Sequence, residues 1–227
     1  MNGVGISYFI TGTDTGVGKT LVSCALLQGY AAQGRRVAGF KPVAAGVDAD
    51  GMNDDAKALL AAGNMPLKYE QVNPYCLREA IAPHIAAQLA DTDIDLTRIV
   101  ESYTALRVRA DMVIVEGAGG FVVPMNANED TSDLARHLGL PIILVIGMRL
   151  GCLNHALLTV EAIAARGLKL AGWVANRLDK DMARFHENVA TLQLRIRAPM
   201  LGIVPYQEQP DAREVAKYLD LKLMGRA

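Results

Sequence analysis

A glycine-rich segment near the N-terminus, GTDTGVGKT at residues 12–20, contains the residue types that bind phosphate groups. It follows a short apolar run, Ile6–Ile10, and precedes a segment with helical periodicity, so a strand, a turn and a helix start are expected in that order. Glycines let backbone N–H groups close around a phosphate, and the helix N-terminus adds the positive end of its dipole. Lys19 would then contact the outer phosphates, and the Thr20 hydroxyl would bind Mg²⁺. The segment therefore predicts nucleotide binding, the alternative being a flexible turn with a solvated lysine.

The spacing of this loop departs from the common pattern G-x-x-x-x-G-K-[ST] at one position. Counting back from Gly18, Thr13 stands where the first glycine belongs, and Gly12 lies one residue earlier. The segment is therefore predicted to be a variant of the phosphate-binding loop.

Acidic residues stand at two further places near expected strand ends. Glu116 follows the apolar run Met112–Val115 and precedes the stretch GAGG, whose glycines permit close approach of a ligand. An acidic, turn-forming segment at residues 48–55 ends in Asp55. Ligands in open α/β sheets bind outside the carboxyl ends of the strands, so we predict that Thr20, Asp55 and Glu116 hold Mg²⁺ beside the phosphates. The alternative for the acidic segment is a set of solvated turn and capping residues.

A lysine also follows a predicted strand. Lys41 comes directly after Arg36–Phe40 and precedes Pro42, which restricts the backbone at that point. Lys41 is therefore expected to approach the phosphate site from a fixed direction, the alternative being an ordinary surface lysine. We predict that Lys19 and Lys41 are the catalytic residues, because both would stabilise negative charge on a transferring phosphoryl group.

Two later segments indicate binding sites, one for an anionic group of a substrate and one for the purine base of a nucleotide. After the apolar run Ile142–Ile146, residues 151–154 open a helix whose free N–H groups would suit an anionic group such as a carboxylate. His155 in the same turn is either a general base or, as is commoner for a single histidine, structural. Asn176 ends another predicted strand, and its amide can hydrogen-bond both the donor and the acceptor edges of a purine ring.

The elements that position these groups alternate between short β-branched runs and longer segments of helical period. Such alternation predicts an α/β fold, a mostly parallel sheet covered by helices on both faces. Gly167 is expected to close the helix predicted at Leu153–Arg166. Strands are predicted at Ile6–Ile10, Arg36–Phe40, Met112–Val115, Ile142–Ile146, Leu170–Ala175 and Met200–Val204, and helices at Lys19–Gln33, Ala56–Ala62, Leu96–Arg109, Leu153–Arg166 and Met182–Arg195.

Composition and charge favour one compact enzyme domain over residues 1–227. Hydrophobic residues make up 51% of the chain, enough for a full core, and 23 basic against 24 acidic residues give no electrostatic case for nucleic acid or an anionic membrane surface. No apolar run reaches the roughly 18 residues of a membrane helix. Cys24, Cys76 and Cys152 form no C-x-x-C pair, so neither a disulfide framework nor a zinc site is expected, and the reducing cytoplasm is the expected location.

With these residues in view, the chain resembles the dethiobiotin synthetase family over nearly its whole length. A phosphate loop is shared by many nucleotide enzymes, whereas the segments GFKPVAAG, VEGAGG and LGCLNHALLT together are far more specific. The resembling segments, in family order and at family spacing, are GTDTGVGKT, GFKPVAAG, VNPY, APHIAAQ, VIVEGAGG, LGCLNHALLT and LAGWVANR.

The resemblance implies a P-loop NTPase-type fold and an ATP- and Mg²⁺-dependent ring closure of 7,8-diaminononanoate with CO₂ in biotin synthesis, releasing ADP and phosphate. It also implies a homodimer with the substrate site at the subunit interface, where the partner subunit supplies the segment 151–154. The implied nucleotide contacts are Gly16, Val17, Gly18, Lys19, Thr20, Leu21, Asp55, Glu116, Gly117, Ala118, Gly119, Asn176, Arg177, Pro205, Tyr206 and Gln207. The implied substrate contacts are Thr15, Lys41, Ala45, Gly151, Cys152, Leu153 and Asn154.

Three positions depart from the family pattern. Gly16 stands where some members carry an acid, and Ala45 and Ala82 stand where many carry a hydroxyl residue near the substrate. Polar substrate contacts at these positions are therefore not carried over from the family, and the choice among nucleotides is left open.

Other classes of nucleotide-binding protein are less consistent with the sequence. A spatial-organising ATPase of the ParA or MinD kind has an extra lysine in the loop, and that position holds Asp14 here. A nucleotide-sensing module would need neither Lys41 nor the loop at Gly151. A cobyrinate diamide synthase needs a glutaminase domain, for which 227 residues leave no room.

Overall fold

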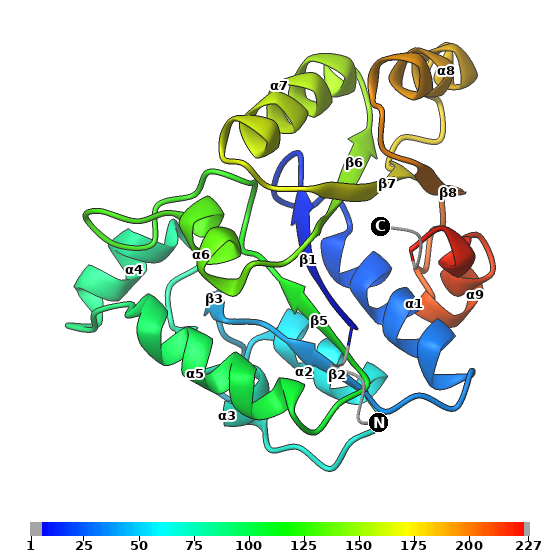
Figure 1. The fold of residues 1–227 in the computed structure, drawn as a ribbon. Coiled ribbons are helices and arrows are strands. Elements are labelled where there is room, and N and C mark those ends of the chain that lie inside the picture. Colours follow the sequence, from blue (N-terminus) through cyan, green and yellow to red (C-terminus); the bar gives the residue numbers. More distant parts are fainter. Residues whose placement is uncertain (1–5, 225–227) are drawn as a thin grey trace.

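Six parallel strands form the central sheet of the computed structural model, which describes residues 6–224. Figure 1 shows the sheet running through the middle of the molecule, with β1 at its centre. The strand order is β2-β5-β1-β6-β7-β8, and each neighbouring pair is parallel. The strands are β1 Ile6–Gly12, β2 Val37–Phe40, β5 Met112–Glu116, β6 Ile142–Met148, β7 Leu170–Arg177 and β8 Met200–Val204.

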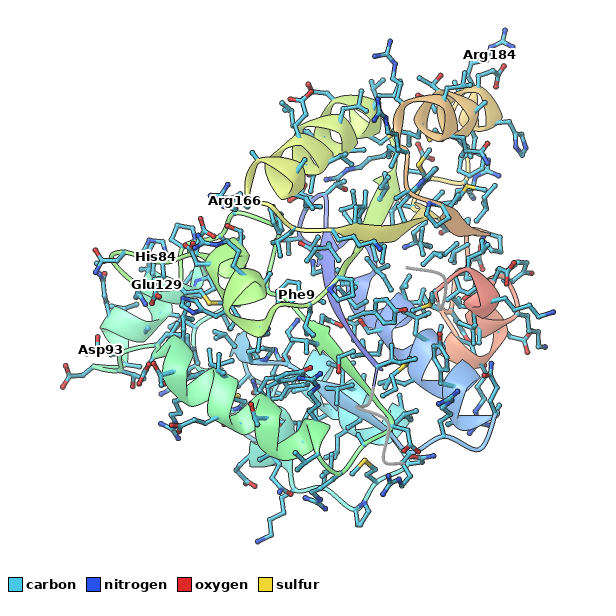
Figure 2. All side chains as sticks on the ribbon, in the orientation of Figure 1. Phe9, His84, Asp93, Glu129, Arg166 and Arg184 are labelled. Carbon is cyan, nitrogen blue, oxygen red and sulfur yellow. The ribbon has the colours of Figure 1, made fainter. Side chains whose placement is uncertain are left out.

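Helices cover both faces of this sheet because the buried strands are apolar on both sides. Ile10 and Ile114 face the core that α1, α2 and α9 cover, whereas Phe9, labelled in Figure 2, faces the core under α5 and α6. Leu144 packs in a third cluster with α7 and α8. The helices are α1 Lys19–Ala31, α2 Asp54–Ala62, α3 Tyr69–Val72, α4 Pro83–Leu89, α5 Leu96–Arg107, α6 Thr131–Leu138, α7 Cys152–Ala165, α8 Phe185–Arg195 and α9 Ala212–Ala216, followed by a 3₁₀ turn at Leu221–Leu223.

The parallel α/β fold predicted from the sequence is confirmed, and the differences lie at element ends. β7 continues to Arg177, so Asn176 and Arg177 lie within the strand and not after it. The helix predicted from Met182 begins at Phe185, because Arg184 adopts a left-handed conformation with φ of 55° and caps it. Gly167 has a φ of 69° directly after α7, as a closing glycine requires.

A second, two-stranded sheet was not predicted. It pairs β3, Val43–Ala45, with β4, Tyr75–Leu77, in parallel and lies beside the carboxyl end of β2. Each strand has three residues, too few to show a period of two. This small sheet carries Ala45 and, with α3 and α4, builds a wall beside the carboxyl edge of the large sheet.

The carboxyl ends of the central strands meet at one edge. Ile10 of β1 is in register with Glu116 of β5, and Phe40 of β2 is in register with Val115. The loops after β1, β2 and β5 therefore begin side by side, which is the arrangement that ligand sites of open α/β sheets use. Among residues 6–224, no helix has the length and apolarity needed to cross a membrane.

Candidate active site

The phosphate-type loop joins β1 to α1 and leaves the start of α1 without a side-chain cap. Gly18 is the N-cap residue, with a left-handed φ of 90°, and no side chain bonds to the N–H groups of the first turn. A β-carbon at Gly18 would lie 2.2 Å from Nδ2 of Asn176, so no other residue fits there without displacing this amide. The uncapped N–H groups and the helix dipole make this turn a site for an anion.

Lys19 begins α1 and is only 7% exposed. Its Nζ donates a hydrogen bond to the Asp14 carbonyl oxygen at 3.1 Å, across the loop. Burial, together with the positive charge of Lys41, outweighs the nearby carboxylates and lowers the pKa of Lys19 to about 8. A buried ammonium with one backbone partner has hydrogens left for the oxygens of a phosphate.

Thr20, Asp55 and Glu116 come together at the next position along the loop. The Thr20 hydroxyl lies 2.7 Å from Asp55 Oδ1 and 2.8 Å from Glu116 Oε1. These residues stand at the start of α1, the start of α2 and the end of β5. The sequence predicted that these three residues would gather, and the structure brings them within hydrogen-bond distance.

Lys41 lies between the same two carboxylates. Its Nζ is 2.7 Å from Glu116 Oε1 and 2.9 Å from Asp55 Oδ2, and its side chain is 5% exposed. Burial alone would lower the pKa of Lys41, but Glu116 and Asp55 more than offset this and raise it. Burial would raise the pKa of Asp55, and Lys41 and the Thr20 hydroxyl reverse that effect, so the pKa is lowered. Lys41 is thus a charged member of the site, not a surface lysine.

The donor set at this point suits a magnesium ion. Glu116 is fully buried, and its Oε2 has no hydrogen-bond partner among the described residues, which is costly unless a ligand satisfies it. Burial, with Glu116 and Asp55 next in effect, raises the pKa of the Cys24 thiol to about 12. Within residues 6–224 no three His, Cys, Asp or Glu side chains gather to hold a metal. Two carboxylates and a hydroxyl fit Mg²⁺, which keeps several waters and phosphate oxygens.

The other acidic residues near Asp55 point to a different partner. Asp48, Asp50 and Asp54 all contact Nζ of Lys57, at 2.5, 3.2 and 2.9 Å. Their hydrogen bonds raise the pKa of Lys57. Asp55 alone among this acidic segment reaches the Thr20 hydroxyl, so the remaining acids are surface turn and capping residues, as the alternative interpretation allowed.

A cavity of about 550 Å³ opens beside Lys41 and Asp55. Thr15 and the glycines after β5 line one side, and Gly119 has a left-handed φ of 62° that brings the chain close to Thr15. Ala45 and Ala82, where the family pattern has hydroxyl residues, supply methyl groups to the opposite wall. The lining residues are Asp14, Thr15, Lys41, Ala44, Ala45, Asn53, Asp55, Ala80, Ile81, Ala82, Pro83, Ala118, Gly119, Gly120 and Val123.

The predicted purine contacts lie on the other side of the phosphate-type loop. Asn176 is 4% exposed and donates a hydrogen bond from Nδ2 to the Val17 carbonyl oxygen at 2.8 Å. Arg177 is engaged elsewhere, since its guanidinium bonds the carbonyl oxygens of Asp179 and Lys180 and stacks 4.8 Å from the Phe185 ring.

The remaining predicted nucleotide contacts differ in how accessible they are. Tyr206 is 39% exposed. Pro205 is half-buried, and the Gln207 side chain accepts a hydrogen bond from the Asp211 N–H at 3.0 Å. Leu21 packs on the core under α1, and Gly117 continues the β5 pairing through its N–H to the Ile10 carbonyl oxygen.

The predicted substrate segment after β6 does not line this cavity. Gly151 caps α7 in a left-handed conformation with φ of 94°, and Cys152 is buried beneath it. Leu153 is half-buried, and Asn154 and His155 are exposed. The loop is tied to the phosphate-type loop by Arg149, which contacts the Asp14 carboxylate at 2.5 Å.

Comparison with known sequences identifies the family. A family model described as an AAA domain matches residues 7–214. The ATP-dependent dethiobiotin synthetase BioD of Nitrosospira multiformis is 54% identical over 98% of this chain and 98% of its own length. That of Aromatoleum aromaticum is 53% identical over 95% of this chain and 97% of its own. The chain belongs to the dethiobiotin synthetase family. The resemblance on which the sequence analysis relied is therefore confirmed, and with it membership of a family of ATP-dependent ligases.

Solved structures agree with this family in fold. The MinC:MinD cell division complex of Aquifex aeolicus aligns with a TM-score of 0.58 at 14% identity, covering 98% of this chain and 97% of that one. MinD from Pyrococcus horikoshii, solved with Mg-ADP, aligns with a TM-score of 0.55 at 18% identity, covering 98% and 90%. At such identities the likeness shows only the P-loop NTPase fold that dethiobiotin synthetases share.

Three residues that the sequence analysis did not single out are connected to the site by hydrogen bonds or an ion pair. Tyr69 and Asn73, on and directly after α3, connect the backbone of Lys41 to the start of α2 through hydrogen bonds. The segment VNPY contains one of them, but no spacing rule links Tyr69 to Asp55 in the sequence. Arg149 is a second addition, visible only once β1 and β6 are neighbours.

Proposed function

We propose that this chain catalyses the ATP- and Mg²⁺-dependent ring closure of 7,8-diaminononanoate with CO₂ to dethiobiotin, with release of ADP and phosphate. The observation that supports this most directly is the position of Lys41. Its ammonium lies between Asp55 and Glu116 and lines the cavity beside the phosphate-type loop. A protein that only bound or hydrolysed ATP would not need a second buried lysine facing a cavity of this size.

The chemistry must bring two anions together. Addition of CO₂ to one amine gives a carbamate, whose oxygen then attacks the γ-phosphoryl group of ATP to form a carbamic–phosphoric anhydride. Lys19 would hold the outer phosphates, and Lys41 would neutralise the carbamate as it approaches. Mg²⁺, when held by Thr20, Asp55 and Glu116, would supply further positive charge next to the phosphates. The second amine then attacks the anhydride carbonyl carbon, phosphate leaves, and the cyclic urea closes.

Positioning supplies much of the acceleration in this scheme. The last step is intramolecular, so a cavity that holds the diamine in a folded conformation raises the effective concentration of the second amine. The cavity of about 550 Å³ is large enough for a nine-carbon chain, and Ala45 and Ala82 give it an apolar wall. At positions 45 and 82 the backbone groups are the remaining polar partners, since the hydroxyls of the family pattern are missing.

The nucleotide would extend from the phosphate-type loop towards β7. Asn176 uses one amide hydrogen on the Val17 carbonyl oxygen. Its second hydrogen and its oxygen are suited to the N7 and amino groups of adenine, which supports ATP as the nucleotide. Arg177, engaged with loop carbonyl groups, would act by holding the residues 179–180 beside the base and not by contacting it.

The complete site would require a second copy of the chain. Gly151 and its neighbours lie outside the cavity of their own chain, so the substrate carboxylate would bind these N–H groups of the partner subunit. An exposed apolar surface beside the cavity supports such a contact. Ile85 and Leu89 lie four residues apart on α4 and are 43% and 69% exposed, and Ile81, just before this helix, is 44% exposed. The three free cysteines support a cytoplasmic location for this homodimer.

The experiment that tests the function is a coupled phosphate-release assay with purified protein. Diaminononanoate and bicarbonate are supplied together and separately, with ATP, CTP or GTP, and the product is identified by mass spectrometry. Phosphate release that requires the diamine, with dethiobiotin as product, is the expected result. ADP formation at the same rate without diamine would instead make the protein a plain ATPase.

A further inference from the structure

We propose that Tyr69 and Asn73 are positioning residues that set the separation of Lys41 from Asp55, and through it the strength of Mg²⁺ binding. This rests on the proposed metal site of Thr20, Asp55 and Glu116. Neither residue lines the cavity, and the side chains of both form hydrogen bonds with groups outside the phosphate-type loop. Their effect would pass through the backbone groups described below.

Asn73 fixes the main chain at Lys41. It is 3% exposed, and its Nδ2 donates to the Lys41 carbonyl oxygen at 2.7 Å and to the Tyr75 carbonyl oxygen at 3.1 Å. The Lys41 N–H donates in turn to the Val72 carbonyl oxygen at 2.8 Å. Both backbone polar groups of Lys41 are thus bonded to the segment 72–73.

Tyr69 carries the connection to α2. Its hydroxyl donates to Asn73 Oδ1 at 3.0 Å and accepts the Asn53 N–H at 2.8 Å. Asn53 is the N-cap of α2, where its side-chain oxygen accepts from the Ala56 N–H at 3.2 Å. Asp55 lies in the first turn that this cap begins, so the position of its carboxylate follows from that of Asn53.

The connection is fully hydrogen-bonded and the Asn73 amide at its centre is buried, which makes it stiff. The Asn73 amide uses both hydrogens and its oxygen, and burial raises the pKa of Tyr69 to about 12, so the hydroxyl stays protonated and able to donate. A buried amide in such a network leaves unpaired groups whichever member is removed. The chain from the Lys41 carbonyl to Asp55 therefore has few alternative arrangements.

Groups that hold metal-binding side chains in place affect metal affinity without touching the metal. Removing the Tyr69 hydroxyl would free the start of α2, and the Asp55 carboxylate would no longer be held at hydrogen-bond distance from Thr20. Binding of nucleotide phosphates would be preserved, because among the described residues no hydrogen bond joins the loop at residues 12–20 to α3. Mg²⁺-dependent steps should weaken while Mg²⁺-free nucleotide binding should not.

The test measures binding of ADP by calorimetry with and without Mg²⁺, in wild-type protein and in Tyr69→Phe, Asn73→Ala and the double variant. Tyr69→Phe is the variant least able to disturb folding, since it loses one oxygen atom. The control is Tyr30→Phe, whose hydroxyl lies 3.5 Å from the Leu221 carbonyl oxygen at the far end of α1. Melting temperatures are recorded for all of them.

Tyr69→Phe is expected to lower the Mg²⁺-dependent gain in ADP affinity by about tenfold and to raise the Mg²⁺ concentration needed for half-maximal activity by a similar factor. ADP binding without Mg²⁺ and the behaviour of Tyr30→Phe should match wild type. The double variant should be no worse than Asn73→Ala alone, because both residues act through one connection.

Two results would overturn the inference. If Tyr69→Phe and Asn73→Ala keep the wild-type Mg²⁺ gain while their melting temperatures fall, the two residues are only structural, and the proposed function is untouched. If wild-type protein itself binds ADP equally with and without Mg²⁺, the metal site fails and the positioning role fails with it.

Discussion

The Lys41 Nζ and the Glu116 Oε1 atoms form a buried ion pair 2.7 Å long, in which the side chains are 5% and 0% exposed. The pair joins the carboxyl ends of β2 and β5, which are neighbours in the sheet. In such a pair the loss of one partner leaves an uncompensated charge in a poorly solvated place. Each partner can therefore be tested for a catalytic role only when its effect on stability is measured too.

Replacing Lys41 with Met should cost on the order of 3 kcal/mol in transition-state stabilisation, roughly a hundredfold or more in kcat. ATP affinity should change much less, because Lys19 and the loop N–H groups already hold the phosphates. Steady-state kinetics and ATP binding by calorimetry measure the two effects. Lys57→Met is the matched control, since Lys57 pairs only with surface carboxylates. A loss of ATP binding in proportion to the loss of activity would assign Lys41 to the nucleotide instead.

Replacing Glu116 with Gln should leave the fold intact and weaken the binding of Mg²⁺, so that activity requires a higher Mg²⁺ concentration. The substitution keeps the size of the side chain and removes the charge that a hard cation needs. Activity titrated with Mg²⁺ measures the effect, and the half-maximal concentration should rise several-fold or more. A titration curve that coincides with that of wild type would make Glu116 a structural partner of Lys41.

Lys19→Ala and Thr20→Val should each abolish turnover, because they remove a phosphate contact and a metal contact. Thr20→Val keeps the shape of the side chain, so its circular dichroism spectrum and melting curve should remain close to those of wild type. Thr191→Val, which removes a hydroxyl bonded to the Glu187 carbonyl oxygen on α8, should leave activity unchanged. Rapid ADP production by folded Lys19→Ala protein would exclude the phosphate-loop assignment.

The sequence predicted the strands and the groups at their ends because both depend on local patterns. Glu116 could be placed beside the phosphate-type loop from the rule that parallel strands share a carboxyl edge. Asp55 was predicted as a metal ligand, but nothing in the segment 48–55 shows that Lys57 binds three of its other acids. That choice depends on the rotation of α2, which the Asn53 cap sets.

The connection through Tyr69 and Asn73 could not be predicted. It depends on α3 and on two strands of three residues each, elements that are too short to produce a periodic pattern. The C-terminal end of β7 and the start of α8 differ from the predicted boundaries for a similar reason. The strand continues through the polar residues Asn176 and Arg177, and a left-handed Arg184 caps the start of the helix. At these places, contacts with distant parts of the chain determine the element boundaries more than local propensity does.

Asp130 offers a test of stability at a residue that does not line the proposed active-site cavity. Its carboxylate caps α6 by accepting the Ser132 N–H at 2.7 Å and the Asp133 N–H at 3.2 Å, and it pairs with Arg166 at 3.1 Å. Figure 2 labels this arginine at the end of α7. Burial would raise the pKa of Asp130, but the hydrogen bonds from Ser132 and Asp133 and the charge of Arg166 outweigh it, so the pKa is lowered.

A lowered folded-state pKa fixes the sign of the pH dependence. In the unfolded chain the carboxyl titrates near its usual value of about 3.9, so the stabilisation is complete above that pH and is lost as pH falls through the folded-state pKa. Asp130→Ala should therefore lose about 1 kcal/mol of unfolding free energy at pH 7 and less at pH 3. Urea unfolding at both pH values measures this. Asp130→Asn, which keeps the capping oxygen without the charge, should recover only part of the loss at pH 7. A deficit of equal size at both pH values would show that the cap acts through packing, not through its charge.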